Sequence, residues 1–300
     1  MRLRTLPLST AGVVLGILLA VADWQVNWLT AVLVVLTTVS LQILSNLSNE
    51  LGDVLKGTDG ADRQGPGYGL NSGELTVKDM KILIGLFVVV CMVLGSAMVY
   101  SSWGTLLDIG KPAAEMDWSP TLVLLLGAGA IWAAMKYTLG KNPYGYRGLG
   151  DLYVFIFFGL VSVMGSYLVC THTVFWRLLL PGAAVGFFSV GVLNVNNIRD
   201  AKTDAVNRVT VAIKLGPKRA RIYQTILIVL GWACMISYCL LRWHSWWHYL
   251  FVLTLPLYII HLRGVWTRDE KALDPMLPLL VMSTFLFCVL AGFGFDIYLI

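Results

Sequence analysis

Charged side chains are scarce in this sequence. Only 13% of its 300 residues are Asp, Glu, Lys or Arg, whereas about a quarter of the residues in an average soluble domain are charged. Apolar residues make up 57% of the chain, and the mean hydropathy is +0.74. This composition excludes a soluble globular domain and indicates a protein that crosses a membrane several times.

Cysteine and histidine are also few, with five and four residues in the chain. The cysteines show no CxxC spacing, which argues against a metal-binding cysteine motif, and their apolar surroundings indicate simple packing roles. His244 and His248 stand beside a tryptophan-rich segment typical of the membrane interface, so we interpret them as interfacial residues and not as metal ligands. Any metal site in this chain should therefore use oxygen ligands.

Long stretches without an ionised residue separate the few charges. Each stretch is at least 18 residues long, about what a helix needs to cross the hydrocarbon core. Their length and lack of alternation exclude a β-barrel. The sequence therefore predicts an all-α integral membrane protein with nine transmembrane helices, at residues 5–22, 24–49, 82–107, 118–135, 152–176, 178–198, 222–241, 243–262 and 275–295.

The basic residues predict the orientation of these helices. If the N-terminus is cytoplasmic, all but three of the 22 lysines and arginines fall in internal segments, the exceptions being Lys111, Arg177 and Arg242. The net charge of +5 reflects this asymmetry and gives no reason to expect a nucleic-acid partner. Residues 1–22 imitate a signal peptide, but Pro7 within the apolar run and the eight further spans favour a retained first helix.

An acidic cluster follows the second span. Its sequence, NLSNELGDVLKGTDGAD, covers residues 46–62 and is unusually polar for this chain. On a helix, Asn49 and Asp53 are four residues apart and share a face. Acids gathered on one face at the end of a membrane span require a positive partner. The carboxylates of the cluster are Glu50, Asp53, Asp59 and Asp62.

The second half of the chain repeats this arrangement. The segment NVNNIRDAKTD covers residues 194–204, where Asn196 precedes Asp200 by four residues and Asp204 follows four residues later. Each cluster follows the second span of a four-span unit, which predicts two parallel repeats, about 1–138 and 151–262, within one domain of residues 1–300. The ninth span, about 275–296, is left over. Four spans return the chain to the same side, so both clusters should lie at the cytoplasmic face.

Two facing clusters of carboxylates and amides form an all-oxygen site. Hard cations prefer oxygen, and Mg²⁺ typically binds through one or two carboxylates together with substrate phosphates. The clusters therefore predict a diphosphate site bridged by Mg²⁺, and a diphosphate beside a greasy bundle indicates a lipid-tailed substrate. Cleavage of an allylic diphosphate gives a carbocation that aromatic faces stabilise. The interleaved bases that could neutralise the leaving diphosphate are Lys56, Arg63, Arg199, Lys202 and Arg208.

These motifs resemble the UbiA family of membrane prenyltransferases, which attach polyprenyl chains to aromatic acceptors. NLSNELGDVLKGTDGADR and NNIRDAKTD match the paired Asp-rich motifs of that family. The details RTLP at residues 4–7, DRxGP at 62–66 and PYGYxGLGD at 143–151 resemble the branch that acts on 1,4-dihydroxy-2-naphthoate in menaquinone biosynthesis. One departure is Glu50, where that branch is expected to carry Asp.

The resemblance implies a helical bundle with a central cavity and a cytoplasmic cap, in the inner membrane of a bacterium. It implies Mg²⁺-dependent transfer of a polyprenyl chain from its diphosphate to dihydroxynaphthoate, with loss of CO₂. It also implies roles for particular side chains. Asn49, Asp53, Asp59, Asn196, Asp200 and Asp204 would hold the metal, with the four aspartates as catalytic residues. Lys56, Arg63 and Lys202 would bind the diphosphate, and Tyr137, Tyr144, Arg147 and Asp151 would orient the acceptor.

Alternatives remain open at this point. The acceptor could be 4-hydroxybenzoate or homogentisate, and the loop at 136–151 could be a tight turn at the membrane surface. An ion-coupled transporter also combines parallel repeats with acids inside a membrane protein. A lipid-binding scaffold without catalysis is a third reading. The acids lie at span ends together with basic residues, which favours phosphate chemistry over transport.

Overall fold

The computed structural model describes residues 5–56, 69–70, 73–108, 115–205 and 208–297. Within these residues the chain is helical, and nine helices or helical runs are long and apolar enough to cross a membrane. The prediction of nine spans is confirmed for this part of the chain. The spans are Leu6–Asp23, Trp28–Leu55, Val77–Trp103, Ser119–Lys136, Gly150–Thr171, Trp176–Arg199, Pro217–Leu241, Trp246–Thr267 and Glu270–Asp296.

The first four spans are single helices, and the later ones are partly divided. The first four are α1 (Leu6–Asp23), α2 (Trp28–Leu55), α3 (Val77–Trp103) and α4 (Ser119–Lys136). The fifth and sixth consist of α5 (Gly150–Val154), η3 (Phe155–Val161) and α6 (Ser162–Thr171), then η4 (Trp176–Leu178) and α7 (Leu179–Arg199). The last three consist of α10 (Pro217–Leu241), η5 (Trp246–Thr254) with α11 (Leu255–Thr267), and η6 (Glu270–Leu273) with α12 (Met276–Asp296). Short elements between spans are η2 (Tyr144–Tyr146), α8 (Ala201–Asp204) and α9 (Val211–Leu215).

The start of α3 shows how the predicted bounds differ from the observed ones. The charge-free criterion starts the third span at residue 82, but the helix already begins at Val77. The Thr76 hydroxyl accepts a hydrogen bond from the Asp79 N–H, and the Asp79 carboxylate accepts one from the Thr76 N–H, which forms a capping box. A helix can thus extend past the apolar core, because its polar first turn satisfies the free backbone N–H groups.

The fifth span is interrupted by a π-helical turn, η3, that the sequence did not predict. Gly159 in this turn packs directly on the backbone of α7, where an added Cβ would lie 2.5 Å from Gly186 Cα. The wider turn and the two glycines allow the fifth and sixth spans to approach closely. This contact fixes the span that carries the second acidic cluster against the wall of the bundle.

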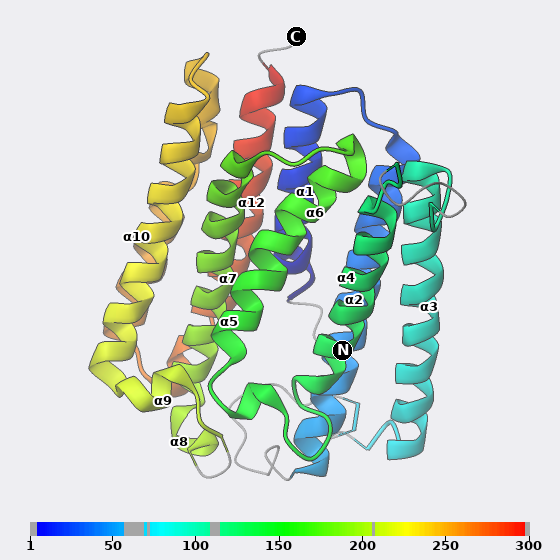
Figure 1. Ribbon diagram of the computed structural model, residues 1–300. Helices are drawn as coiled ribbons and strands as arrows, with labels where there is room; N and C mark the ends of the chain where they lie inside the picture. The colour runs from blue at the N-terminus through cyan, green and yellow to red at the C-terminus, as the bar shows by residue number, and fades with distance from the viewer. Residues whose placement is uncertain (1–4, 57–68, 71–72, 109–114, 206–207, 298–300) are drawn as a thin grey trace.

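Helix α1 lies at the centre of the bundle, packed against α12, α6 and α2 (Figure 1). Leu15 and Leu19 of α1 are fully buried, and Gly12 and Gly16 let α6 approach so closely that Ser162 and Ser166 fill the space a Cβ would need. Helices α2, α3 and α4 form a group on one side of α1, and α7, α10 and α12 lie on the other (Figure 1).

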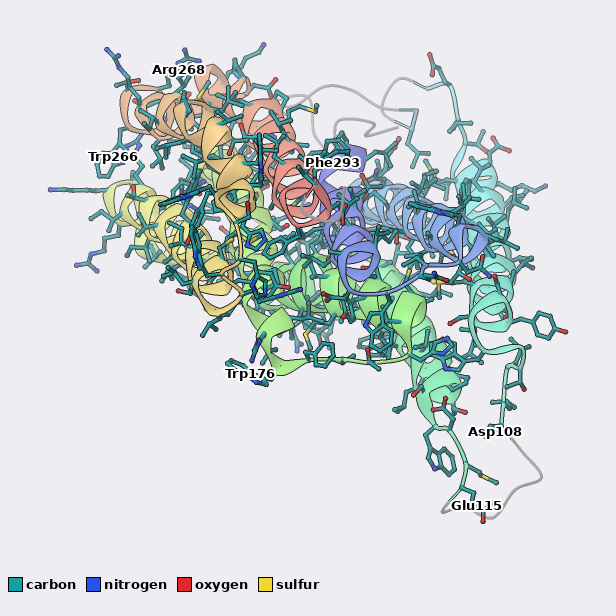
Figure 2. The ribbon with its side chains drawn as sticks, turned by 90° about the horizontal axis from the view of Figure 1, so that it is seen from above. Asp108, Glu115, Trp176, Trp266, Arg268 and Phe293 are labelled. Carbon is teal, nitrogen blue, oxygen red and sulfur yellow. The ribbon has the colours of Figure 1, made fainter. Side chains whose placement is uncertain are left out.

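Large apolar side chains cover the outside of the bundle. Trp176 and Trp266 point away from the helices at the rim of the view in Figure 2, and Phe293 is half exposed. Such an apolar exterior would aggregate in water, but it suits a protein surrounded by lipid. Helices α2 and α7 both end at the lower end of the bundle in Figure 1, where α8 and α9 follow α7. The predicted repeat halves remain a prediction.

Candidate active site

A cavity of about 810 Å³ lies between the two groups of helices. Its walls come from α1, α2, α3, α4, the fifth span, α7 and α12, and both acidic clusters line it. The end of the cavity that holds the two acidic clusters, here called the motif end, has a polar lining. The other end is apolar and is lined by Val34, Met98, Val123 and Leu126. The cavity thus has a charged region at one end and an apolar region at the other.

The first acidic cluster lies on the last two turns of α2. Asn49 and Asp53 both line the cavity, and Asp53 is only 3% exposed. Thr138, just after α4, donates to the Ser48 carbonyl at 2.8 Å and to the Asn49 side-chain oxygen at 3.3 Å. The end of α4 therefore orients the amide of Asn49.

Arg208 joins the two clusters. Its guanidinium forms an ion pair with Asp53 of the first cluster and lies 3.9 Å from the Asp204 carboxylate of the second. Tyr146 supports this bridge, because its hydroxyl donates to Asp53 Oδ1 at 2.7 Å and its ring centroid lies 4.5 Å from the guanidinium carbon of Arg208. Burial disfavours the charged form of Arg208, but the two carboxylates outweigh this effect and raise the pKa of its guanidinium.

The second cluster is held by Arg199, at the end of α7. Its guanidinium donates twice to Asp200, at 2.8 and 2.7 Å, and once to the side-chain oxygen of Asn196 at 2.9 Å. A further hydrogen bond of 2.6 Å reaches Asp274, just before α12. This fork fixes the geometry of the second cluster and ties it to the last span. Asn196, Asp200, Asp204 and Asp274 all line the cavity.

Of the two described lysines predicted to bind diphosphate, Lys202 lines the cavity and Lys56 does not. Lys56 follows α2, and its Nζ is 4.7 Å from the centroid of the Tyr146 ring, on which Arg208 also lies. Burial and the neighbouring charge of Arg208 lower the pKa of the Lys56 ammonium. Lys202 lines the cavity but is 84% exposed, and its ion pair with Glu270 raises the pKa of its ammonium. Lys56 and Arg208 are close enough to repel each other, and this repulsion favours the binding of an anion between them.

The loop after α4 brings only some of its predicted residues to the cavity. Tyr137 and Tyr144 line it, but the Tyr144 hydroxyl donates to the Ala133 carbonyl at 2.7 Å. Burial raises the pKa of Tyr144, so its phenol stays protonated at neutral pH. Arg147 is exposed and is not part of the lining. Asp151 also lies outside the lining, because it accepts a hydrogen bond of 3.0 Å from Tyr223 on α10.

The same loop is held in place by backbone contacts. The Val209 N–H donates to the Tyr146 carbonyl at 3.1 Å, which links the loop to the segment that carries Arg208. Gly148 has a φ of +78°, a conformation that L side chains rarely adopt. An added Cβ on Gly145 would lie 2.6 Å from the Tyr137 carbonyl oxygen. The glycines of this loop thus allow the turn that brings Tyr146 to Asp53.

Glu50 of the first acidic cluster is among the described residues, whereas Asp59 and Arg63 are not. Asp59 and Arg63 lie outside the described residues, so their predicted roles in metal and diphosphate binding stay predictions. Glu50 is buried, does not line the cavity, and accepts a hydrogen bond of 2.8 Å from the Leu70 N–H. The Glu at this position therefore anchors the start of the next loop segment.

The donor set fits Mg²⁺. All the cluster side chains in the cavity offer oxygen, the ligand atom that Mg²⁺ prefers. Among the described residues, no three His, Cys, Asp or Glu side chains form a ready metal cage. Instead, the Arg208 guanidinium lies between the carboxylates of Asp53 and Asp204, and its positive charge balances their negative charge. This arrangement suits a metal that enters with the substrate phosphates and not a permanent structural ion.

The family comparison decides between the enzyme and the alternatives. Residues 9–287 match the model of the UbiA prenyltransferase family. The chain belongs to that family. This prenyltransferase is 40% identical, over 281 residues, to the 1,4-dihydroxy-2-naphthoate octaprenyltransferase of Escherichia coli, covering 92% of this chain and 87% of that protein. It is 36% identical over 299 residues to the Haemophilus influenzae protein of the same name, covering 98% and 93%.

Solved structures of the family share the fold. A UbiA homolog from Aeropyrum pernix K1 in its apo form superposes with a TM-score of 0.73 at 16% identity, covering all of both chains. A UbiA homolog from Archaeoglobus fulgidus bound to GPP and Mg²⁺ gives a TM-score of 0.64 at 16% identity, covering 98% of this chain and 99% of that one. The family match and the two relatives, together with the membrane-spanning helices, make this protein a multi-pass membrane enzyme, a polyprenyltransferase.

Sequence reasoning missed some residues that the structure places at the site. Tyr146 is one of them, although it lies in the loop motif between the predicted Tyr144 and Arg147. Nothing in the sequence shows which tyrosine of a turn faces the acids. Arg208 and Arg199 were noted as interleaved bases, but their bridging roles depend on the approach of α2, α7 and α12. Asp274 lies 70 residues from the second cluster and carried no local signal.

Proposed function

We propose that this prenyltransferase transfers a polyprenyl chain from its diphosphate to 1,4-dihydroxy-2-naphthoate. The products would be diphosphate, CO₂ and demethylmenaquinone in its quinol form. The observation that carries the proposal is the meeting of both acidic clusters on Arg208 at the polar end of the cavity. The names of the E. coli and H. influenzae relatives supply the acceptor.

The residues of the chain suggest how the donor is held. Asn49 and Asp53 on one side, and Asn196, Asp200 and Asp204 on the other, would hold Mg²⁺, with Asp59 joining them from outside the described residues. The metal would neutralise the diphosphate and stabilise it as a leaving group. With Mg²⁺ held by these carboxylates, Arg208 would no longer pair with Asp53, and together with Lys56 and Lys202 it would bind the diphosphate oxygens.

The reaction balances without an added oxidant or base. The C–O bond of the allylic diphosphate breaks, and its electron pair leaves with the diphosphate. The ring carbon that bears the carboxylate attacks the allylic carbon, and loss of CO₂ returns an electron pair to the ring. Tyr153, Phe157 and Phe158 line the cavity and present aromatic faces that would stabilise the carbocation and exclude water from it.

The experiment uses purified full-length protein in nanodiscs with a polyprenyl diphosphate, Mg²⁺ and carboxyl-labelled dihydroxynaphthoate. We expect equal release of diphosphate and labelled CO₂, loss of both on chelation, and recovery when Mg²⁺ is restored. Turnover that survives chelation contradicts the metal role. Competition with 4-hydroxybenzoate and homogentisate tests the acceptor, and a preference for either one overturns that part of the proposal.

We further propose that the motif end faces the cytoplasm of a bacterial inner membrane. The distribution of lysine and arginine supports this orientation. Single cysteines at Asn142, in the loop after α4, and at Ser245, between α10 and η5, test it in intact spheroplasts. A membrane-impermeant maleimide should label the cysteine at position 245 and not the one at position 142. The reverse pattern overturns the orientation.

A further inference from the structure

The polar lining of the cavity continues beyond the first acidic cluster, towards the N-terminal end of α2. Gln42, Ser45 and Asn46 line the cavity on the same helix face as Asn49 and Asp53. Thr5, just before α1, lines it as well. These side chains carry no charge and therefore differ from the metal and diphosphate region. They form a second polar region of the cavity.

The amides of this region bind one another in a defined direction. Gln42 Nε2 donates to Asn46 Oδ1 at 3.0 Å and to Thr5 Oγ1 at 3.2 Å. Asn46 Nδ2 donates to the same Thr5 oxygen at 3.4 Å. Both N–H groups of Gln42 are thus used, which fixes the orientation of its amide and leaves Oε1 as its remaining polar atom.

Gln42 Oε1 has no donor in the part of the chain that the structure describes. The residue is only 7% exposed, and it lines the cavity. Gln42 Oε1 is not one of the fully buried unpaired side-chain atoms of the described residues, so it is open to the cavity, where a ligand can donate a hydrogen bond to it. An apolar polyprenyl tail against this oxygen would keep it unsatisfied. A ligand with a hydroxyl group would satisfy it.

The distance along α2 suits the aromatic acceptor. Gln42 precedes Asn49 by seven residues, which is two helical turns or about 10 Å. A fused bicyclic ring with its reacting carbon beside the diphosphate extends away from the metal region towards Gln42. Tyr144 and Tyr153, stacked with ring centroids 3.9 Å apart, line the same cavity and offer a flat aromatic surface.

We propose that Gln42 Oε1 accepts a hydrogen bond from a hydroxyl of the aromatic acceptor, namely the hydroxyl at C4, the one further from the reacting carbon. This inference rests on the proposed function, and it makes Gln42 a specificity-determining residue. A site built to bind a hydroxyl discriminates strongly against an analogue without it, because the buried partner is then left unpaired. The cavity thus distinguishes a 1,4-diol from a monohydroxylated ring.

The test compares the parent enzyme with Gln42→Met, which keeps the length of the side chain but removes the amide. We expect the KM for dihydroxynaphthoate to rise about 10-fold, the effect of one lost hydrogen bond, while the KM for the polyprenyl diphosphate stays unchanged. Ser40→Ala is the matched control. Ser40 lies on the same helix, is also 7% exposed and does not line the cavity, and its hydroxyl donates to the Leu36 carbonyl.

A second measurement distinguishes recognition from a packing defect. 1-Hydroxy-2-naphthoate, which lacks the C4 hydroxyl, is used as a competitive inhibitor. The parent should bind it about 10-fold more weakly than the diol, and Gln42→Met should bind both equally. If Gln42→Met does not fold, Gln42→Asn provides a second variant. Its shorter side chain keeps the amide but moves it away from the acceptor, so the acceptor KM and the binding of the two naphthoates should change in the same direction by a smaller factor.

Each other outcome overturns a different claim. An unchanged acceptor KM in Gln42→Met, or a raised KM for the donor alone, overturns the role of Gln42 and leaves the prenyl transfer reaction intact. Equal binding of the two naphthoates by the parent overturns it as well. Failure of the parent to prenylate dihydroxynaphthoate instead overturns the proposed function.

Discussion

The two ends of the bundle contain the same combination of side chains, an aspartate, an arginine and a tyrosine, but it serves a different purpose at each end. At the motif end, Asp53 pairs with Arg208 and accepts a hydrogen bond of 2.7 Å from Tyr146. At the opposite end, Asp23 pairs with Arg242 and accepts a hydrogen bond of 2.8 Å from Tyr167. Each group is thus an aspartate held by a guanidinium and a tyrosine.

The cavity makes the difference between them. Asp53 and Arg208 line it, and Arg208 also faces an acid of the second cluster, so a ligand can replace this contact. Asp23 and Arg242 do not line it. They join the ends of α1 and α10, and Arg242 also donates to Tyr238 at 2.8 Å. Side-chain chemistry alone therefore does not identify an active site, and access to a cavity does.

The sharpest test of this comparison replaces the two aspartates. Asp53→Asn should lower turnover at least roughly 100-fold, because a neutral amide neither attracts Mg²⁺ nor balances Arg208. Asp23→Asn should leave the turnover of folded enzyme within about threefold, since Asp23 is remote from the cavity. Diphosphate release per mole of folded protein measures both. Similar losses in the two variants would contradict the distinction.

The second test concerns Arg208. Arg208→Gln should lower kcat/KM for the donor between about 10-fold and 100-fold, the range for lost charge-assisted hydrogen bonds to phosphate. Arg208→Lys should recover part of this loss, because it restores the charge without the planar fork. Activity is measured at saturating acceptor with the donor varied. An unchanged donor KM and kcat in Arg208→Gln would show that Arg208 stabilises the ligand-free site but does not bind the donor.

The third test concerns stability at the opposite end. Arg242→Gln leaves Asp23 without its cation in a partly buried position, so the folded state should lose about 2 kcal/mol. The midpoint of thermal unfolding in detergent should fall by several degrees. Turnover at 25 °C should stay near that of the parent. A large loss of turnover without loss of stability would place a catalytic role at this end.

The fourth test uses the pH dependence of Lys56, which lies beside Tyr146 and Arg208. Burial and Arg208 lower the pKa of Lys56, so rising pH removes this charge earlier than in a free lysine. Donor affinity should therefore weaken on the alkaline side. In Arg208→Gln the repulsion is absent, the pKa of Lys56 rises, and the alkaline limb should move to higher pH. Donor KM measured against pH in both proteins reports the shift, and Lys56→Gln should abolish the limb.

The smallest effect is expected for Asp151. It was predicted from the loop motif to orient the acceptor, but it pairs with Tyr223 outside the cavity lining. Asp151→Asn keeps a hydrogen-bond acceptor for Tyr223, so turnover and acceptor KM should stay within about twofold. Acceptor kinetics at several concentrations provide the measurement. A selective rise in acceptor KM would confirm the role that the motif predicts for Asp151.

Much of the fold follows from simple regularities in the sequence. Nine apolar stretches had to become helices, because a backbone in lipid must satisfy its own hydrogen bonds. The spacing from Asn49 to Asp53 placed both on one face of α2, and the structure shows them in one cavity. The π-turn of η3 did not follow, because it depends on the contact of Gly159 with α7, which no local pattern encodes.

The sequence by itself determined that this chain spans a membrane and carries two oxygen-rich clusters, since hydropathy and spacing are local properties. Only the tertiary structure decided which polar residues share the cavity. It brought Arg208 between Asp53 and Asp204, chose Tyr146 instead of Arg147 or Asp151 as a partner of the site, and left Gln42 Oε1 facing the ligand space. These choices depend on how distant helices approach one another, and such distances are set by packing across the whole bundle.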